Sequence, residues 1–161
     1  MSETPPEEEP VGRLRPTSPG VLTAWGVTGL VAGWLLHAYA DREMDAAPIV
    51  TWAQPLALFL VAGILGVTAR ATWRTVHVRR ERLLPHQAVN RLVLARACAY
   101  VGVLVAGGYL GYAVSWVGVS AELAEQRAVR SLVAALGGAC VVATALLLER
   151  ACRVRKGPDA P

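Results

Sequence analysis

Charged side chains are scarce in this chain, and they are almost absent from four long stretches of it. Of its 161 residues, 17% are charged and 54% are hydrophobic, whereas a soluble domain carries about 25% charged residues. The 16 Lys and Arg and the 12 Asp and Glu all lie outside four apolar runs, except for Arg96 and Arg130. So much apolar sequence excludes a chain that is disordered throughout, and this segregation of charge is typical of a membrane protein.

The four apolar runs cover residues 20–39, 49–69, 92–116 and 128–148. Each is long enough for an α-helix to cross a hydrocarbon core about 30 Å thick. Inside lipid, a helix pairs its backbone polar groups within the segment. A soluble bundle would instead need helices with a polar face, which these runs lack. The sequence therefore predicts an all-α, multi-pass integral membrane four-helix bundle within residues 20–156.

The two ends of the chain differ from the runs. Residues 1–19 contain four glutamates and five prolines and have little apolar surface to bury, so we expect a disordered acidic tail. Residues 157–161 predict a short frayed end. Ala38-Tyr39-Ala40 resembles a signal-peptidase site, so cleavage after Ala40 stays open as an alternative to a first span that is kept.

The basic residues between the runs predict the orientation. One side of the bundle would hold twelve Lys and Arg, in the N-terminal tail, the middle loop and the C-terminal tail, and the other side three. Positive residues are enriched in cytoplasmic loops. We therefore expect both termini and the middle loop to be cytoplasmic, in the inner (cytoplasmic) cell membrane.

The middle loop is the most basic part of the chain. Residues 70–83 contain no Gly or Pro, so the second run is expected to continue as a helix until Pro85 interrupts it. Arginines of this loop and of the C-terminal tail are candidates for contact with anionic lipid headgroups or a protein partner. They are Arg70, Arg74, Arg79, Arg80, Arg82, Arg150 and Arg153. Nucleic acid is not an expected partner, because no stacking aromatics alternate with the basic residues.

The sequence offers little for chemistry. The four runs contain no Asp or Glu, the residues with which proton-coupled carriers usually act inside the membrane. No HExxH, Walker A or GxSxG motif occurs, and the three cysteines do not have the spacing of a zinc site. We therefore predict no catalytic residue, no cofactor and no metal, and we do not expect an enzyme.

Small residues are abundant in the runs instead. Gly29 and Gly33, and likewise Gly107 and Gly111, form GxxxG patterns, and Gly137 is followed by Gly138. Such residues let membrane helices approach closely, within this bundle or in an oligomer. Near the cytoplasmic side, Arg96 and Glu149 would lie at a similar depth if runs three and four pack antiparallel. We predict that these two form a structural ion pair.

Several segments together resemble a known family. They are Arg15-Pro16-Thr17, then Arg91 to Ala99, then the glycine-rich residues 106–111, and the ending Leu148 to Arg153. In this order and spacing they are similar to actinobacterial membrane proteins grouped as domain of unknown function family 3180. The resemblance implies a four-helix inner-membrane protein, in a family often encoded beside folate-biosynthesis genes, and it implies no activity.

These observations favour a non-catalytic structural or accessory membrane subunit that binds the bilayer and a second copy or another membrane protein. The alternative is a small transporter or channel subunit that acts as an oligomer, with Gln54 and Tyr109 lining a path. A membrane enzyme of lipid or pterin metabolism would need catalytic residues that the sequence does not show.

Overall fold

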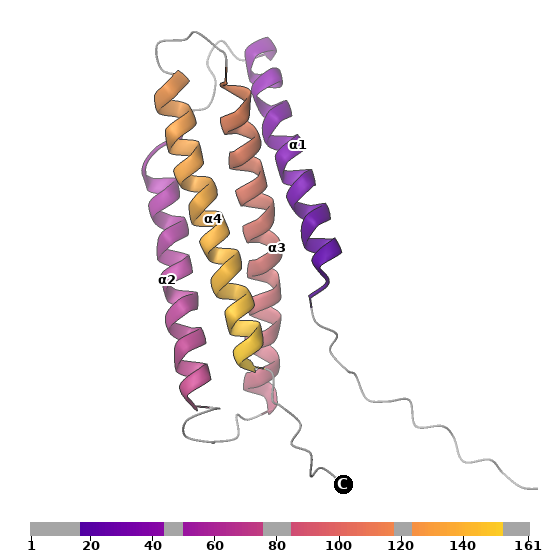
Figure 1. Ribbon diagram of the computed structural model, residues 1–161, viewed down its shortest axis with the longest axis vertical. Helices are drawn as coiled ribbons and strands as arrows, with labels where there is room; N and C mark the ends of the chain where they lie inside the picture. Colours follow the sequence, from indigo (N-terminus) through magenta and orange to yellow (C-terminus); the bar gives the residue numbers. More distant parts are fainter. Residues whose placement is uncertain (1–16, 44–49, 76–84, 118–123, 153–161) are drawn as a thin grey trace, which may run out of the picture.

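The computed structural model describes residues 17–43, 50–75, 85–117 and 124–152, and the side chains of all of these except 37, 41–43 and 85–88. They form the helices α1 (Pro19–Glu43), α2 (Ala53–Trp73), α3 (Pro85–Ser115) and α4 (Ala124–Cys152), and there is no strand among them (Figure 1). The predicted all-α class is thus confirmed. The predicted helix beyond Thr75, the disordered tail and the frayed end lie outside the described residues.

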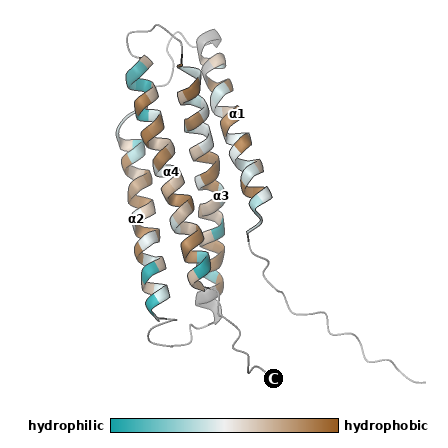
Figure 2. Cartoon of the chain, in the orientation of Figure 1, coloured by the Kyte–Doolittle hydropathy of each residue, from teal (hydrophilic) through white to brown (hydrophobic). Residues whose placement is uncertain are grey.

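All four helices are long enough and apolar enough to cross a membrane. Hydrophobic residues cover their middle parts and hydrophilic residues gather near their ends (Figure 2). Together these features are typical of a membrane protein.

Prolines lie in the first turn of three of the helices. Pro19 and Pro85 are the first residues of α1 and α3, and Pro55 lies in the first turn of α2. A proline fits there because the first turn has no partner for its backbone N–H groups. The second apolar run begins at Ile49, but α2 begins only at Ala53. There the side-chain oxygen of Gln54 accepts a hydrogen bond of 2.9 Å from the Thr51 backbone.

The helices form an open row in the order α2, α4, α3, α1 (Figure 1). Extensive interfaces join α2 to α4, α4 to α3 and α3 to α1, and among the described residues no comparable interface joins α1 to α2. Sequence neighbours α1 and α2 therefore lie at opposite ends of the row.

The direction of each helix follows from its contacts. Gly26 and Leu30 of α1 lie against Gly107 and Gly111 of α3, so α1 and α3 are parallel. Ala106 of α3 lies against Gly138, and Ala95 packs near Leu148, so α3 and α4 are antiparallel, as expected. In consequence α1 begins where α4 ends, and Thr17 and Cys152 lie at the same end of the bundle. The membrane side on which this end lies stays a prediction.

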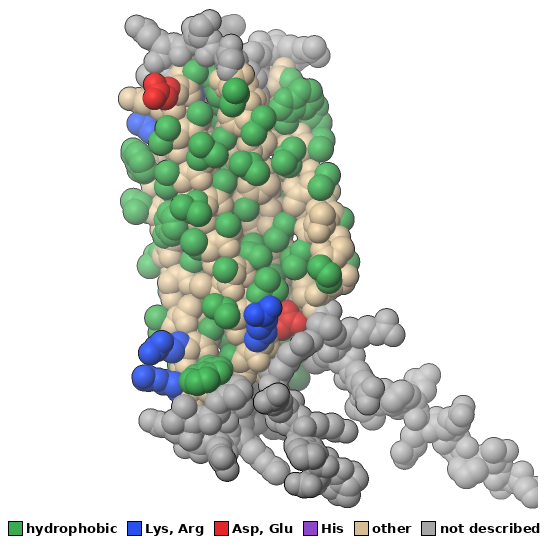
Figure 3. Space-filling model, viewed as in Figure 1, with side chains coloured by type: hydrophobic (Ala, Val, Ile, Leu, Met, Phe, Trp, Pro, Cys, Tyr) green, Lys and Arg blue, Asp and Glu red, His purple; other side chains and the backbone are tan. Residues whose placement is uncertain are grey.

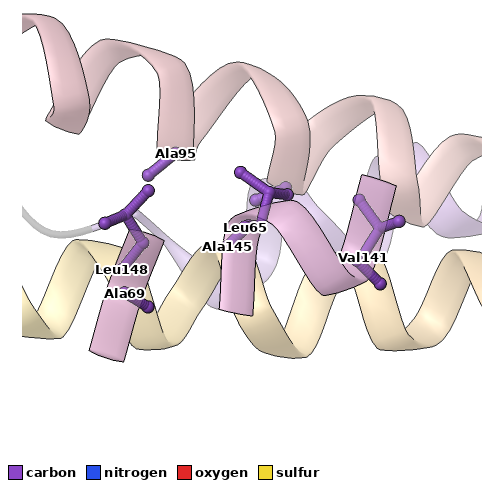
Figure 4. Close-up of a cluster of buried hydrophobic side chains, with 8 residues drawn as sticks. Leu65, Ala69, Ala95, Val141, Ala145 and Leu148 are labelled. Atoms are coloured by element: carbon purple, nitrogen blue, oxygen red, sulfur yellow. The ribbon is translucent and has the colours of Figure 1, made fainter. Parts of the chain in front are cut away.

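The core lies among α2, α3 and α4. Its buried residues are Ala62, Leu65, Ala69, Ala95, Ala99, Val141, Ala145 and Leu148 (Figure 4). Alanines predominate, so few large side chains separate these helices. The large hydrophobic side chains instead cover the outer surface, while the described charged side chains lie near the two ends (Figure 3). Such a surface suits lipid and not water.

Candidate functional site

The α1–α3 interface is built from glycine backbone. A Cβ atom added at Gly29 would overlap the carbonyl oxygen of Leu104, and one at Gly33 would overlap that of Gly108. On the α3 side of the interface, a Cβ at Gly107 or Gly111 would overlap a carbonyl oxygen of α1. Because the obstacle on each side is main chain, a turn of a side chain cannot relieve it. This close approach of two parallel helices is the geometry that GxxxG patterns support in membranes.

Gly137 and Gly138 face two different helices. A Cβ at Gly137 would come within 3.0 Å of Leu58 Cβ on α2, and a Cβ at Gly138 within 3.0 Å of Ala106 on α3. The pair therefore lets α4 approach both of its neighbours at one level. Sequence reasoning missed Gly26, although its spacing to Gly29 and Gly33 places all three on one helix face.

A second contact holds α1 at its beginning. Glu149 of α4 is 6% exposed. One of its carboxylate oxygens accepts a hydrogen bond of 3.1 Å from the Thr17 backbone N–H, and the other accepts one of 2.6 Å from the Thr17 hydroxyl. We call this contact the Thr17–Glu149 latch. It joins residues 132 positions apart, between two helices that share no extensive interface.

Arg96 lies one residue beyond Ala95, and Glu149 lies one residue beyond Leu148. Ala95 and Leu148 belong to the same buried cluster and lie close together (Figure 4). Arg96 and Glu149 are thus at a similar level of the bundle, and Arg96 is half-buried. Their ion pair stays a prediction. What the sequence did not suggest is that Thr17 binds both oxygens of the carboxylate.

The end of the bundle that carries the latch also carries arginines; we call it the arginine end. Arg70 and Arg74 at the end of α2 and Arg150 near the end of α4 are exposed. Arg91 is half-buried, and its Nη1 donates a hydrogen bond of 3.0 Å to Thr72 Oγ1, which joins α3 to α2. Arg79, Arg80, Arg82 and Arg153 lie outside the described residues.

The opposite end pairs its arginines with tryptophans. The guanidinium of Arg127 lies 4.9 Å from the centre of the Trp116 ring, and that of Arg130 lies 5.8 Å from the Trp52 ring. Arg130 also donates a hydrogen bond of 3.4 Å to the Val50 carbonyl oxygen. Contact with an aromatic face stabilises a cation, so these two arginines have partners within the bundle. Sequence reasoning counted them only among the three basic residues of the less basic side.

Two grooves flank α1. One, of about 760 Å³, lies between α1, α3 and α4 and is apolar apart from Thr23. The other, of about 560 Å³, lies between α1, α3 and the start of α2 and is lined in part by Gln54, Tyr109 and Tyr112. Gln54 and Tyr109, the two residues predicted for a transport path, are thus brought into one groove. Among the described residues, no group of three His, Cys, Asp or Glu could hold a metal ion.

A model of the protein family DUF3180, described as proteins of unknown function, matches residues 22–156. The chain belongs to this family. No curated protein and no solved structure matches the chain. The predicted family resemblance is confirmed, and the range matched in DUF3180 contains the α1–α3 glycines, Arg96 and Glu149.

Two segments on which the DUF3180 resemblance rests meet in the latch. Thr17 comes from the segment before the first apolar run, and Glu149 from the ending of the last. Thr17 lies just before the matched range and Glu149 inside it. The contact between them gives both segments a structural role, which is to fix the start of α1 to the end of α4.

Proposed function

We propose that this DUF3180 member is a non-catalytic structural or accessory subunit of the cytoplasmic membrane, which binds a second copy or another membrane protein through the sides of its helices. The open row supports this proposal. The buried share of the apolar stretch is 12% in α1, 17% in α3, 22% in α2 and 44% in α4, and α1 has a groove on each side. A helix held on one face leaves its other faces for lipid or a partner.

Both termini are placed in the cytoplasm in this proposal, and the exposed arginines of the arginine end then face anionic lipid headgroups. The support is the excess of Lys and Arg on that side, together with the exposure of Arg70, Arg74 and Arg150. A reporter that is active only in the cytoplasm should be active when it is fused to the C-terminus. Activity of a reporter that needs the opposite side would overturn this orientation.

Purification of the native complex tests the subunit proposal. Ala139 and Ala32 are exposed and line the first and the second groove, so A139F and A32F would fill them. Ala57 is exposed on α2 and lines neither of the two grooves, so A57F is the matched control. We expect a protein, or a second copy, to co-purify with the wild type and with A57F, and to be lost with A139F or A32F. A chain that purifies alone, or equal recovery in all four, contradicts the proposal.

The position of Gln54 and Tyr109 in one groove favours a second candidate, a transporter or channel subunit that acts as an oligomer. In that case, liposomes with the reconstituted protein should show a saturable flux of a small solute. The flux should fall strongly in Q54A and Y109F and stay unchanged in A57F. Flux that is equal in all of these variants would exclude this groove as the path.

A further inference from the structure

The most acidic segment of the chain leads directly to its arginine end. The segment before α1 contains Glu3, Glu7, Glu8 and Glu9. It joins the bundle at Thr17, which the Thr17–Glu149 latch holds against the end of α4. At no more than about 3.5 Å per residue, Glu9 reaches up to about 28 Å from Thr17. The acidic segment is therefore tethered to the bundle at the arginine end, through Thr17.

The exposed arginines of that end lie within this range. Ala69 and Leu148 pack in the same cluster, and the next residues along their helices are Arg70 and Glu149. Arg70 therefore lies at a similar level of the bundle to Glu149, on the helix that packs beside α4. Arg74 follows one turn later on α2, and Arg150 is the neighbour of Glu149 itself. Reach therefore does not limit a contact between the acidic segment and these three arginines.

The charges of the two parts are complementary. Arg70, Arg74 and Arg150 are exposed, and the one acid among the described residues at this end is Glu149, which is buried and bound to Thr17. No described carboxylate therefore neutralises the exposed arginines. An anionic bilayer surface would repel the acidic segment, while these exposed arginines attract it.

We propose that the acidic segment Glu7–Glu9 binds the arginines Arg70, Arg74 and Arg150 of the same chain and competes there with anionic lipid headgroups. The contact with the segment follows from reach and charge alone. The competition rests on the proposed function, in which these arginines face headgroups. The glutamates of the segment would then occupy the arginines in place of anionic headgroups, and the headgroups would displace them where anionic lipid is abundant.

Distance measurement on the full chain in nanodiscs tests the contact. A chain with its three cysteines replaced by alanine would carry one fluorophore at S2C and one at A71C, which lies between Arg70 and Arg74 on α2. In phosphatidylcholine at low salt, energy transfer should be high. It should fall in 1 M salt, where charges are screened beyond about 3 Å, in E7Q/E8Q/E9Q and in R70Q/R74Q/R150Q. Transfer should stay high in the control E125Q, since Glu125 begins α4 at the other end.

The competition has a separate readout. When phosphatidylglycerol is added to the nanodiscs, energy transfer should fall in the wild type. In native mass spectrometry, E7Q/E8Q/E9Q should retain several-fold more phosphatidylglycerol than the wild type, and R70Q/R74Q/R150Q should retain less. Transfer that is the same in the wild type and E7Q/E8Q/E9Q overturns the proposal. A different outcome is that energy transfer differs between the wild type and E7Q/E8Q/E9Q while R70Q/R74Q/R150Q retains as much phosphatidylglycerol as the wild type. In that case the contact stands, but the competition fails, and so does the headgroup role of these arginines in the proposed function.

Discussion

The α1–α3 interface and the core among α2, α3 and α4 are held together by opposite means. In the core, side chains fill the space between helices, as Leu65, Val141 and Leu148 do. At the α1–α3 interface the backbones touch, and there is no space for even a Cβ at Gly29, Gly33, Gly107 or Gly111. The difference teaches that removal of atoms should damage the core, and that addition of atoms should damage the α1–α3 interface. It also makes α1 the helix that depends on few contacts, its glycine face and its latch.

Replacement of a core leucine should have the largest effect. Leu148 is fully buried between α2 and α3, so L148A removes contacts that neither lipid nor water can replace. We expect the free energy of unfolding in mixed micelles to fall by about 2–5 kcal/mol.

The neighbour Leu147 gives the matched control, because its side chain is 53% exposed. L147A should change the free energy of unfolding by less than about 0.5 kcal/mol. Equal losses for L148A and L147A would show that side-chain packing does not hold this part of the bundle.

Addition of one methyl group to the glycine interface should come next. G33A places a Cβ against the carbonyl oxygen of Gly108, and a backbone obstacle can give way only if α1 moves. Overpacking of this kind costs about 1–3 kcal/mol, which should appear in the same unfolding measurement. G111A, which meets Leu30 from the other side, should behave alike.

Gly108 provides the control for G33A within the same interface. A Cβ at Gly108 would lie 3.7 Å from the nearest carbonyl oxygen of α1, an ordinary contact distance. G108A should therefore keep the stability of the wild type. If G108A destabilised the protein as much as G33A, glycine would be needed here for another reason than close approach.

Loss of the latch should weaken α1 alone. E149A leaves the Thr17 N–H and hydroxyl without their acceptor, which costs about 1–3 kcal/mol when such donors are buried. E149Q keeps one acceptor oxygen and should lose less. A double-mutant cycle of T17A with E149Q should give a coupling of about 0.5–1.5 kcal/mol. A coupling near zero would show that the two residues act independently.

Length and composition predicted the helices better than their partners. Length and apolarity suffice for a span, because lipid requires internal backbone pairing, so the four helices and their class could be predicted. The antiparallel α3–α4 pair could be predicted because few residues separate the third and fourth apolar runs. The row order could not, because a GxxxG pattern in α1 does not say which helix it meets. The latch was missed for a similar reason. The expected depth in the membrane suggested Arg96 as the partner of Glu149, whereas Thr17 lies far from Glu149 in the sequence and outside the apolar runs. The stacking of Arg127 of α4 on Trp116, which follows α3, likewise joins two residues that no sequence pattern pairs.

The smallest effect, of opposite sign, is expected at glycines of α2. Nothing lies within 4 Å of a Cβ at Gly63, and a Cβ at Gly66 would meet Thr144 Cγ2 at 3.5 Å, an ordinary contact. A glycine inside a helix costs about 0.5–1 kcal/mol relative to alanine, so G63A should raise the free energy of unfolding by up to that amount. G66A should be neutral or slightly stabilising for the same reason. Since G33A makes the same chemical change with the opposite result, the sign of a Gly→Ala change would report whether the glycine lies against a neighbouring backbone or faces open space. Destabilisation of more than about 0.5 kcal/mol by G63A would mean that the exposed face of α2 is covered in the protein as it was measured.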